Sequence, residues 1–158
     1  MIAPSRNARK ELIDHGIKAE RISVIPNPVP LKSLSAFHKA GGEKFLEGIT
    51  SENIILYVGR ISREKSLHVS LDAVAEMKKK VPDLLFVIVG DGPEMEEMQE
   101  YVRGLGILEH VLFLGSILHD TLMGSDIYDR SKLFLTASTT ETQGITLLEA
   151  MAFGLPVV

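Results

Sequence analysis

The stretch from Asn53 to Gly92, NIILYVGRISREKSLHVSLDAVAEMKKKVPDLLFVIVGDG, decides the fold. Two runs in it, residues 54–58 and 84–89, are apolar throughout and have the length of single strands. Continuous apolar runs of this length are typical of strands that are buried on both faces. Between them, apolar residues recur at helical spacing from Leu67 to Lys80, and Pro82 ends the pattern. The stretch therefore predicts a strand, a helix and a second, parallel strand.

The same alternation continues toward the C-terminus. Apolar runs and helical spacing predict strands at 111–114, 133–136 and 155–158, and helices after Pro93 and around 121–128 and 145–153. Strands that alternate with helices form right-handed crossovers and a sheet that is covered on both sides. The predicted fold class is α/β: a Rossmann-like three-layer domain with a mostly parallel sheet.

The N-terminal part follows a different pattern. Ser5 and Gly16 fit the start and end of a short helix, and residues 21–25 fit a strand. Pro26, Pro28 and Pro30 then open a connecting stretch that runs to Ser51.

Bulk properties exclude several classes of protein. The chain has 158 residues, no cysteine and a formal net charge of −4, so disulfides, thiolate metal sites and a general attraction for nucleic acid are not expected. It lacks the apolar core of a signal peptide, and no apolar run approaches the roughly 20 residues of a membrane span. We expect one soluble, cytoplasmic domain, and both termini look like points at which a longer chain has been cut.

Ligands of such folds bind where loops leave the carboxyl ends of the strands. After Val58, Gly59 allows close backbone approach, and Arg60 and Lys65 offer two cations that suit phosphate oxygens. A solvated basic loop is an equally good interpretation of these residues. Residues 90–93, Gly-Asp-Gly-Pro, lack the third glycine of a dinucleotide fingerprint, so a tight turn is the better interpretation there.

The loop before the last helix is the most informative. Backbone amides near Gly144, Ile145 and Thr146 form an anion site that the helix dipole assists. Glu149 lies on an otherwise apolar helix, where a carboxylate needs hydrogen bonds such as those of ribose hydroxyls. Glu141 stands ahead of the helix and suits sugar hydroxyls. Taken alone, each glutamate fits an ordinary solvent-facing acid, but together with the glycine they favour a binding site.

These motifs resemble the C-terminal, donor-binding domain of retaining glycosyltransferases with the GT-B fold, a family that includes glycogen, sucrose and glycolipid synthases. The resemblance runs nearly end to end. It is carried by Val24-Ile25-Pro26-Asn27, by Tyr57-Val58-Gly59-Arg60 with Lys65, by Val87 to Pro93, by the two glutamates seven apart, and by the sequence from Glu149 to Val158.

The resemblance implies that Arg60 and Lys65 hold the donor diphosphate, that Glu149 binds the ribose, and that Glu141 with the amides after Gln143 cradles the donor sugar. Arg60, Lys65 and Glu141 are then the expected catalytic residues. The expected donor-binding residues are Gly59, Arg60, Lys65, Gly90, Gly115, Ser116, Glu141, Gln143, Gly144, Ile145, Thr146 and Glu149. The backbone near Gly115 and Ser116 would read the nucleobase.

The implied reaction transfers a hexose from a UDP- or GDP-hexose to a glycan or lipid acceptor with retention, without a metal or other cofactor. Residues 1–21 would be a remnant of the N-terminal, acceptor-binding domain, and residues 22–158 a truncated nucleotide-sugar domain. We therefore expect the chain alone to bind donor weakly and to transfer nothing. The whole enzyme has no predicted membrane span, and its peripheral association with a membrane is left open.

Three residues depart from the family pattern: Ser66 and Pro28 replace glycines, and Gln143 replaces an aromatic residue. The sequence Glu-Thr-Gln-Gly at 141–144 is similar to that of diacylglycerol glucosyltransferases, which hints at a lipid acceptor. Two alternatives remain: a nucleotide-sugar epimerase of the same architecture, and a non-catalytic α/β binding domain. The histidines show no ligand spacing, so no metal site is predicted.

Overall fold

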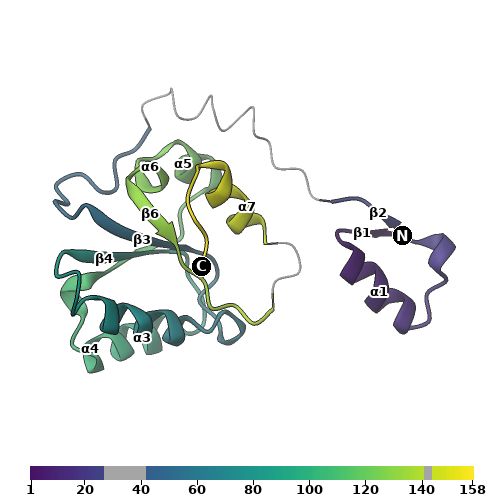
Figure 1. Cartoon of the computed structure of the whole chain (residues 1–158), viewed down its shortest axis with the longest axis horizontal. Helices are drawn as coiled ribbons and strands as arrows, with labels where there is room; N and C mark the ends of the chain where they lie inside the picture. The colour runs from purple at the N-terminus through teal and green to yellow at the C-terminus, as the bar shows by residue number, and fades with distance from the viewer. Residues whose placement is uncertain (27–41, 141–143) are drawn as a thin grey trace.

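The fold is α/β, as the sequence predicts. The computed structural model describes residues 1–26, 42–140 and 144–158 of the chain. Within them the main elements in chain order are β1 Ile2–Ala3, α1 Arg6–Asp14, β2 Ser23–Val24, β3 Asn53–Val58, α3 Leu67–Met77, β4 Leu84–Val89, α4 Met95–Gly104, β5 Val111–Gly115, α5 His119–Gly124, α6 Ile127–Arg130, β6 Ser131–Phe134 and α7 Ile145–Ala152 (Figure 1).

The central sheet has four parallel strands in the order β5-β4-β3-β6. The chain therefore adds β4 and β5 on one side of β3 and then crosses to the other side to add β6. All six residues of β4 are buried, because this strand has neighbours on both edges and helices on both faces. The continuous apolar runs at 54–58 and 84–89 have this cause, and both predicted strands are confirmed.

Two apolar cores lie on opposite faces of the sheet. On one face, α3 and α4 pack through Leu71 and Val102 against Phe86 and Ile88. On the other face, α5, α6 and α7 cover a core that includes Leu56. Figure 1 shows these two helical layers with the sheet between them, which confirms the three-layer arrangement.

Residues 1–26 form a small unit that is held together by contacts among these residues. Strand β1 pairs in parallel with β2, and α1 connects them. The side chain of Ser5 accepts a hydrogen bond from the Ala8 amide and so caps α1, as expected from the sequence.

Some element boundaries differ from the prediction. The helix expected at 121–128 is two helices, because Ser125 is extended and its hydroxyl bonds back to the Leu122 carbonyl. Strand β6 begins at Ser131, two residues before the apolar run, because pairing with β3 extends past it. Of the strand expected at 155–158, the structure shows an isolated parallel bridge between Val157 and Phe134.

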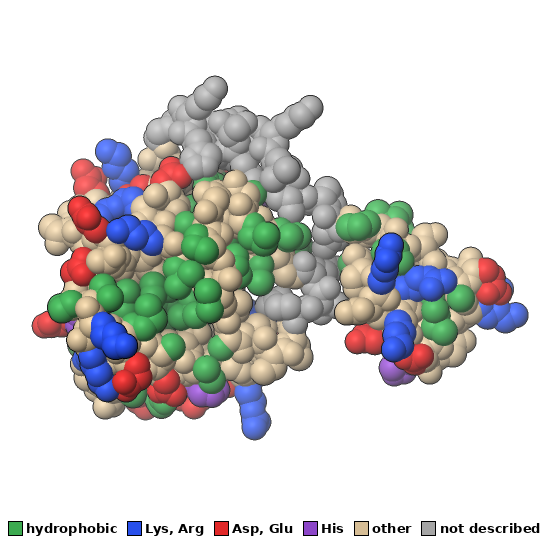
Figure 2. Space-filling view, viewed as in Figure 1, with side chains coloured by type: hydrophobic (Ala, Val, Ile, Leu, Met, Phe, Trp, Pro, Cys, Tyr) green, Lys and Arg blue, Asp and Glu red, His purple; other side chains and the backbone are tan. Residues whose placement is uncertain are grey.

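The surface carries charge of both signs. On the face seen in Figure 2, basic and acidic side chains of the sheet-bearing part are interspersed around an apolar area. No helix within the described ranges is long and apolar enough to cross a membrane.

Candidate functional site

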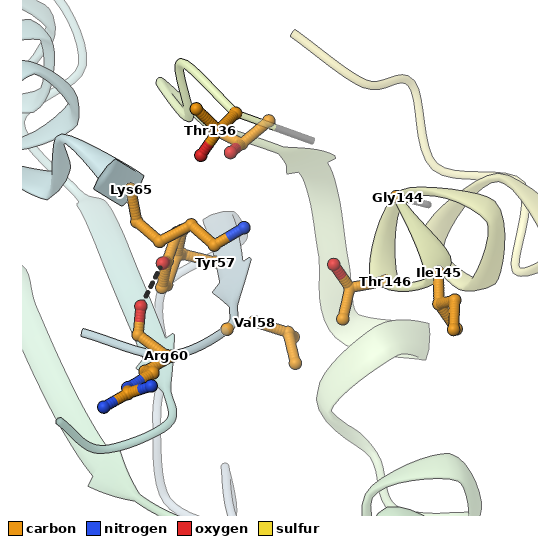
Figure 3. Close-up of a pocket in the computed structure, with 10 residues that line it drawn as sticks. Tyr57, Val58, Arg60, Lys65, Thr136, Gly144, Ile145 and Thr146 are labelled. Carbon is orange, nitrogen blue, oxygen red and sulfur yellow. Dashed lines mark hydrogen bonds between the residues drawn. The ribbon is translucent and has the colours of Figure 1, made fainter. Parts of the chain in front are cut away.

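The strand order creates a crevice at the carboxyl ends of β3 and β6. The loop after β3 leads to α3 on one face of the sheet and the loop after β6 leads to α7 on the other, so the two loops separate and enclose a space between them. Ligands of open α/β sheets bind at this kind of switch point. A cavity of about 520 Å³ lies here, lined by Tyr57, Val58, Gly59, Arg60, Lys65, Thr136, Thr140, Gly144, Ile145 and Thr146 (Figure 3).

The loop after β3 supplies the cations of one wall. In Figure 3 the side chain of Lys65 extends into the cavity, whereas the guanidinium of Arg60 points away from its centre. The Tyr57 hydroxyl donates to the Arg60 carbonyl at 2.9 Å, which fixes the backbone of this turn. Lys65 is therefore placed for an anion in the cavity, and Arg60 would reach one by a change of rotamer.

The opposite wall is the N-terminus of α7. Gly144 has φ +53 and lets the chain turn sharply into the helix, and Ile145 and Thr146 follow in its first turn. The first amides of a helix lack partners within the helix, and its dipole favours negative charge there. The structure thus brings Lys65 and Arg60 to the same cavity as Gly144, Ile145 and Thr146.

Hydrogen bonds tie the two loops together. Thr139 donates to the Glu64 carbonyl twice, from its amide at 3.1 Å and from its hydroxyl at 3.2 Å. Lys65 Nζ donates to Ser138 Oγ at 3.4 Å. Sequence reasoning missed Ser138 and Thr139 as site residues, because their partners lie more than seventy positions away in the chain.

Two glycines after β4 hold the loop after β3 in place. A Cβ on Gly90 would lie 1.9 Å from the Gly59 carbonyl oxygen, and one on Gly92 would lie 2.1 Å from that of Ile61. The Ile61 amide donates to the Asp91 carbonyl at 2.9 Å. The segment 90–93, interpreted from sequence as a tight turn, is thus a backbone-to-backbone support for the loop that carries Arg60.

A second cavity of about 300 Å³ adjoins this support. Its lining includes Gly59, Arg60, Gly90 and Ser116 from the expected donor-binding set, together with Val58, Val89, Asp91, Ile117 and Leu122. Gly115 ends β5 and its carbonyl accepts a hydrogen bond from the Gly90 amide at 2.8 Å. Arg60 borders both cavities and so links them.

Glu149 lies in the apolar interior of α7, as its sequence context predicts. The residue is 6% exposed, and its Oε1 accepts a hydrogen bond from His119 Nε2 at 2.8 Å. That bond raises the pKa of His119, and burial opposes the shift in part. Sequence reasoning missed His119, because no spacing rule connects two residues that meet only when α5 packs beside α7.

The prediction at Glu141 and Gln143 falls on residues outside the described part of the chain, as does Asn27. Within the described residues, no group of three or more His, Cys, Asp or Glu side chains could hold a metal ion.

Comparisons with known proteins identify the family to which the chain is similar. The family model described as "Glycosyl transferases group 1" matches residues 43–158. The chain is 35% identical over its whole length to alpha-monoglucosyldiacylglycerol synthase of Streptococcus pneumoniae, covering 36% of that protein. It is 29% identical over 94% of its length to the synthase of the same name from Acholeplasma laidlawii, covering 39% of it. The chain thus spans somewhat over a third of these curated relatives.

A solved structure extends the likeness to the fold. Anabaena Alr3699/HepE, crystallised with UDP and glucose, superposes with a TM-score of 0.80 at 26% identity, over 99% of this chain and 42% of that one.

Proposed function

The chain belongs to the group 1 glycosyltransferases, and we propose that the whole protein transfers a hexose from a nucleotide diphosphate sugar to a glycan or lipid acceptor. The observation that carries the proposal is the convergence of Lys65, Arg60 and the N-terminus of α7 on one cavity at the switch point of the sheet. A nucleotide diphosphate is an anion of the size and charge that such a cavity recognises.

The residues that line the two cavities would contact different parts of the donor. Lys65 and the first amides of α7 face the same space and would hold the diphosphate from two sides. Arg60 borders the adjoining cavity, where the backbone of Gly90 and Ser116 would enclose the nucleobase. Glu149 would accept hydrogen bonds from the ribose, and Glu141 and Gln143 keep their proposed role beside the sugar.

The proposed contacts to the diphosphate explain how the site would assist the transfer reaction. When the glycosidic bond breaks, negative charge develops on the departing diphosphate. Lys65 and the helix amides stabilise that charge as fixed electrostatic partners, and Arg60 adds to them after a change of rotamer. We propose that transfer proceeds with retention and without a metal.

The donor and acceptor are proposed from the named relatives. The Anabaena structure contains UDP and glucose, which favours a UDP-hexose over a GDP-hexose. The two curated relatives named above are alpha-monoglucosyldiacylglycerol synthases, a name that denotes a glycolipid product, which favours a lipid acceptor over a glycan. We propose that the acceptor is bound by a domain that this chain does not contain, so that the chain alone binds donor and transfers nothing.

Ligand-observed NMR of the chain with UDP, GDP, ADP and their hexose conjugates tests donor binding. Lys65→Ala should weaken the preferred nucleotide about tenfold, because it removes one charge-assisted hydrogen bond. Lys80→Ala is the matched control, since Lys80 is an exposed lysine beyond the C-terminal end of α3. Equal affinity in both variants, or no binding by a folded wild-type chain, contradicts the proposal.

A further inference from the structure

The hydrogen bond between His119 and Glu149 joins a solvent-facing side chain to a buried one. The His119 side chain is 57% exposed, whereas that of Glu149 is 7% exposed. The two residues belong to different helices, α5 and α7, and are thirty positions apart. His119 is therefore the residue through which Glu149 is held from the solvent side.

Glu149 is incompletely satisfied. Among the described residues, its Oε1 has the partner His119 and its Oε2 has no hydrogen-bond donor. A buried carboxylate normally accepts several hydrogen bonds, because burial otherwise destabilises the charge. The nearby Tyr128 hydroxyl is buried and makes no hydrogen bond within the described part of the chain. Burial, together with the charge of Glu149, raises the pKa of Tyr128.

The position of the pair connects it to the donor site. His119 stands between Ile117 and Leu122 in the chain, and both of these residues line the cavity that also contains Gly90 and Ser116. Glu149 is on the helix whose first turn closes the larger cavity. Neither residue of the pair lines one of these cavities itself, but each belongs to a helix that contributes lining residues to one of the two.

We propose that His119 is a positioning residue for donor binding: it holds Glu149 through Oε1 and leaves Oε2 to accept the ribose hydroxyls of the nucleotide. This inference rests on the proposed function and adds a residue to it. Because the His119 side chain is more than half exposed, solvent screens its attraction to Glu149, so orientation of the buried carboxylate is the main effect of the bond. The second acid near His119 is Asp120, whose Oδ1 lies 3.5 Å from His119 Nδ1 and whose side chain is 88% exposed.

The test compares UDP and GDP with their 2′,3′-dideoxy counterparts, because only the first pair offers the ribose hydroxyls. His119→Ala should reduce the preference for the hydroxylated nucleotide about tenfold and leave the affinity for the dideoxy form within about twofold. His119→Gln should keep most of the preference, because its amide can donate to Oε1. His68→Ala is the matched control, since His68 is an exposed histidine on α3.

The outcomes separate this inference from the function on which it rests. If His119→Ala weakens both forms equally, or leaves the preference intact, the positioning role is wrong and nucleotide binding still stands. If the folded wild-type chain binds neither UDP nor GDP, both fail. Circular dichroism of each variant establishes that it is folded before its affinities are compared.

Discussion

The bond from His119 to Glu149 makes stability depend on pH. The pKa of His119 is raised, first by this hydrogen bond, so the folded state favours protonated His119. The contribution is therefore complete below the ordinary histidine pKa of about 6.5 and is lost as pH rises through the higher folded value. Because His119 is more than half exposed, we expect less than about 1 kcal/mol.

Urea unfolding of the wild type and His119→Gln at about pH 5.5 and about pH 8.5 measures this effect. The difference in unfolding free energy between the two proteins should shrink at the higher pH. The same comparison with His68→Ala should show no such trend. A difference that grows with pH would show that His119 is not preferentially protonated in the folded chain.

Ser66 stores backbone strain at the start of α3. It has φ +49 and ψ +41, the left-handed conformation that suits glycine, and its side chain makes no capping hydrogen bond. Ser66→Gly should therefore stabilise the chain by about 1 kcal/mol. Ser66→Ala retains the Cβ and should change stability by less than about 0.5 kcal/mol. Thermal unfolding of the two variants checks the prediction, and equal midpoints would contradict it.

Strand β4 and the turn after it act as a support for the neighbouring loop. Gly90 has φ +139 and no room for a Cβ against the Gly59 carbonyl, so Gly90→Ala should destabilise the chain by about 3 kcal/mol or more. Gly104→Ala is the contrast, because Gly104 ends α4 and a Cβ there meets nothing within 4 Å. That variant should gain up to about 1 kcal/mol.

Urea unfolding ranks these two variants against the wild type. The support interpretation requires Gly90→Ala to be the less stable by a wide margin. Similar stability of the two would mean that the loop after β3 can shift without loss, and that the close approach of the two backbones is not needed.

Elements differ in how far the sequence predicts them. Strands β3 and β4 follow from apolar runs that only a doubly covered strand can bury. Strand β6 begins with Ser131 and Lys132, which no apolar run marks, because its first residue is a buried serine that pairs with Ile54 of β3. The terminal apolar run at 155–158, predicted as a strand, lies beside the end of β6: Val157 bridges Phe134 in parallel, and the Phe134 amide donates to the Pro156 carbonyl at 2.9 Å.

At the scale of the whole molecule, the order of the strands in the sheet determines the site. Apolar runs identify strands but do not specify which strands are neighbours. The sequence could therefore place Lys65 and Thr146 after the carboxyl ends of strands, but it could not show that the two residues face one cavity. The strand order β5-β4-β3-β6 brings these two residues to the same cavity. The role of His119 could not be predicted, because this residue meets Glu149 only when α5 packs beside α7.

Because of the hydrogen bonds between Glu64 and Thr139, the two loops that border the larger cavity should differ in how many substitutions they tolerate. Glu64 takes part through its main-chain carbonyl, a group that every residue type carries. Thr139 contributes an amide, which only proline would remove, and a hydroxyl, which only serine could replace. Mutational scanning of this loop pair would thus meet tolerance on the β3 side and a narrow choice on the β6 side.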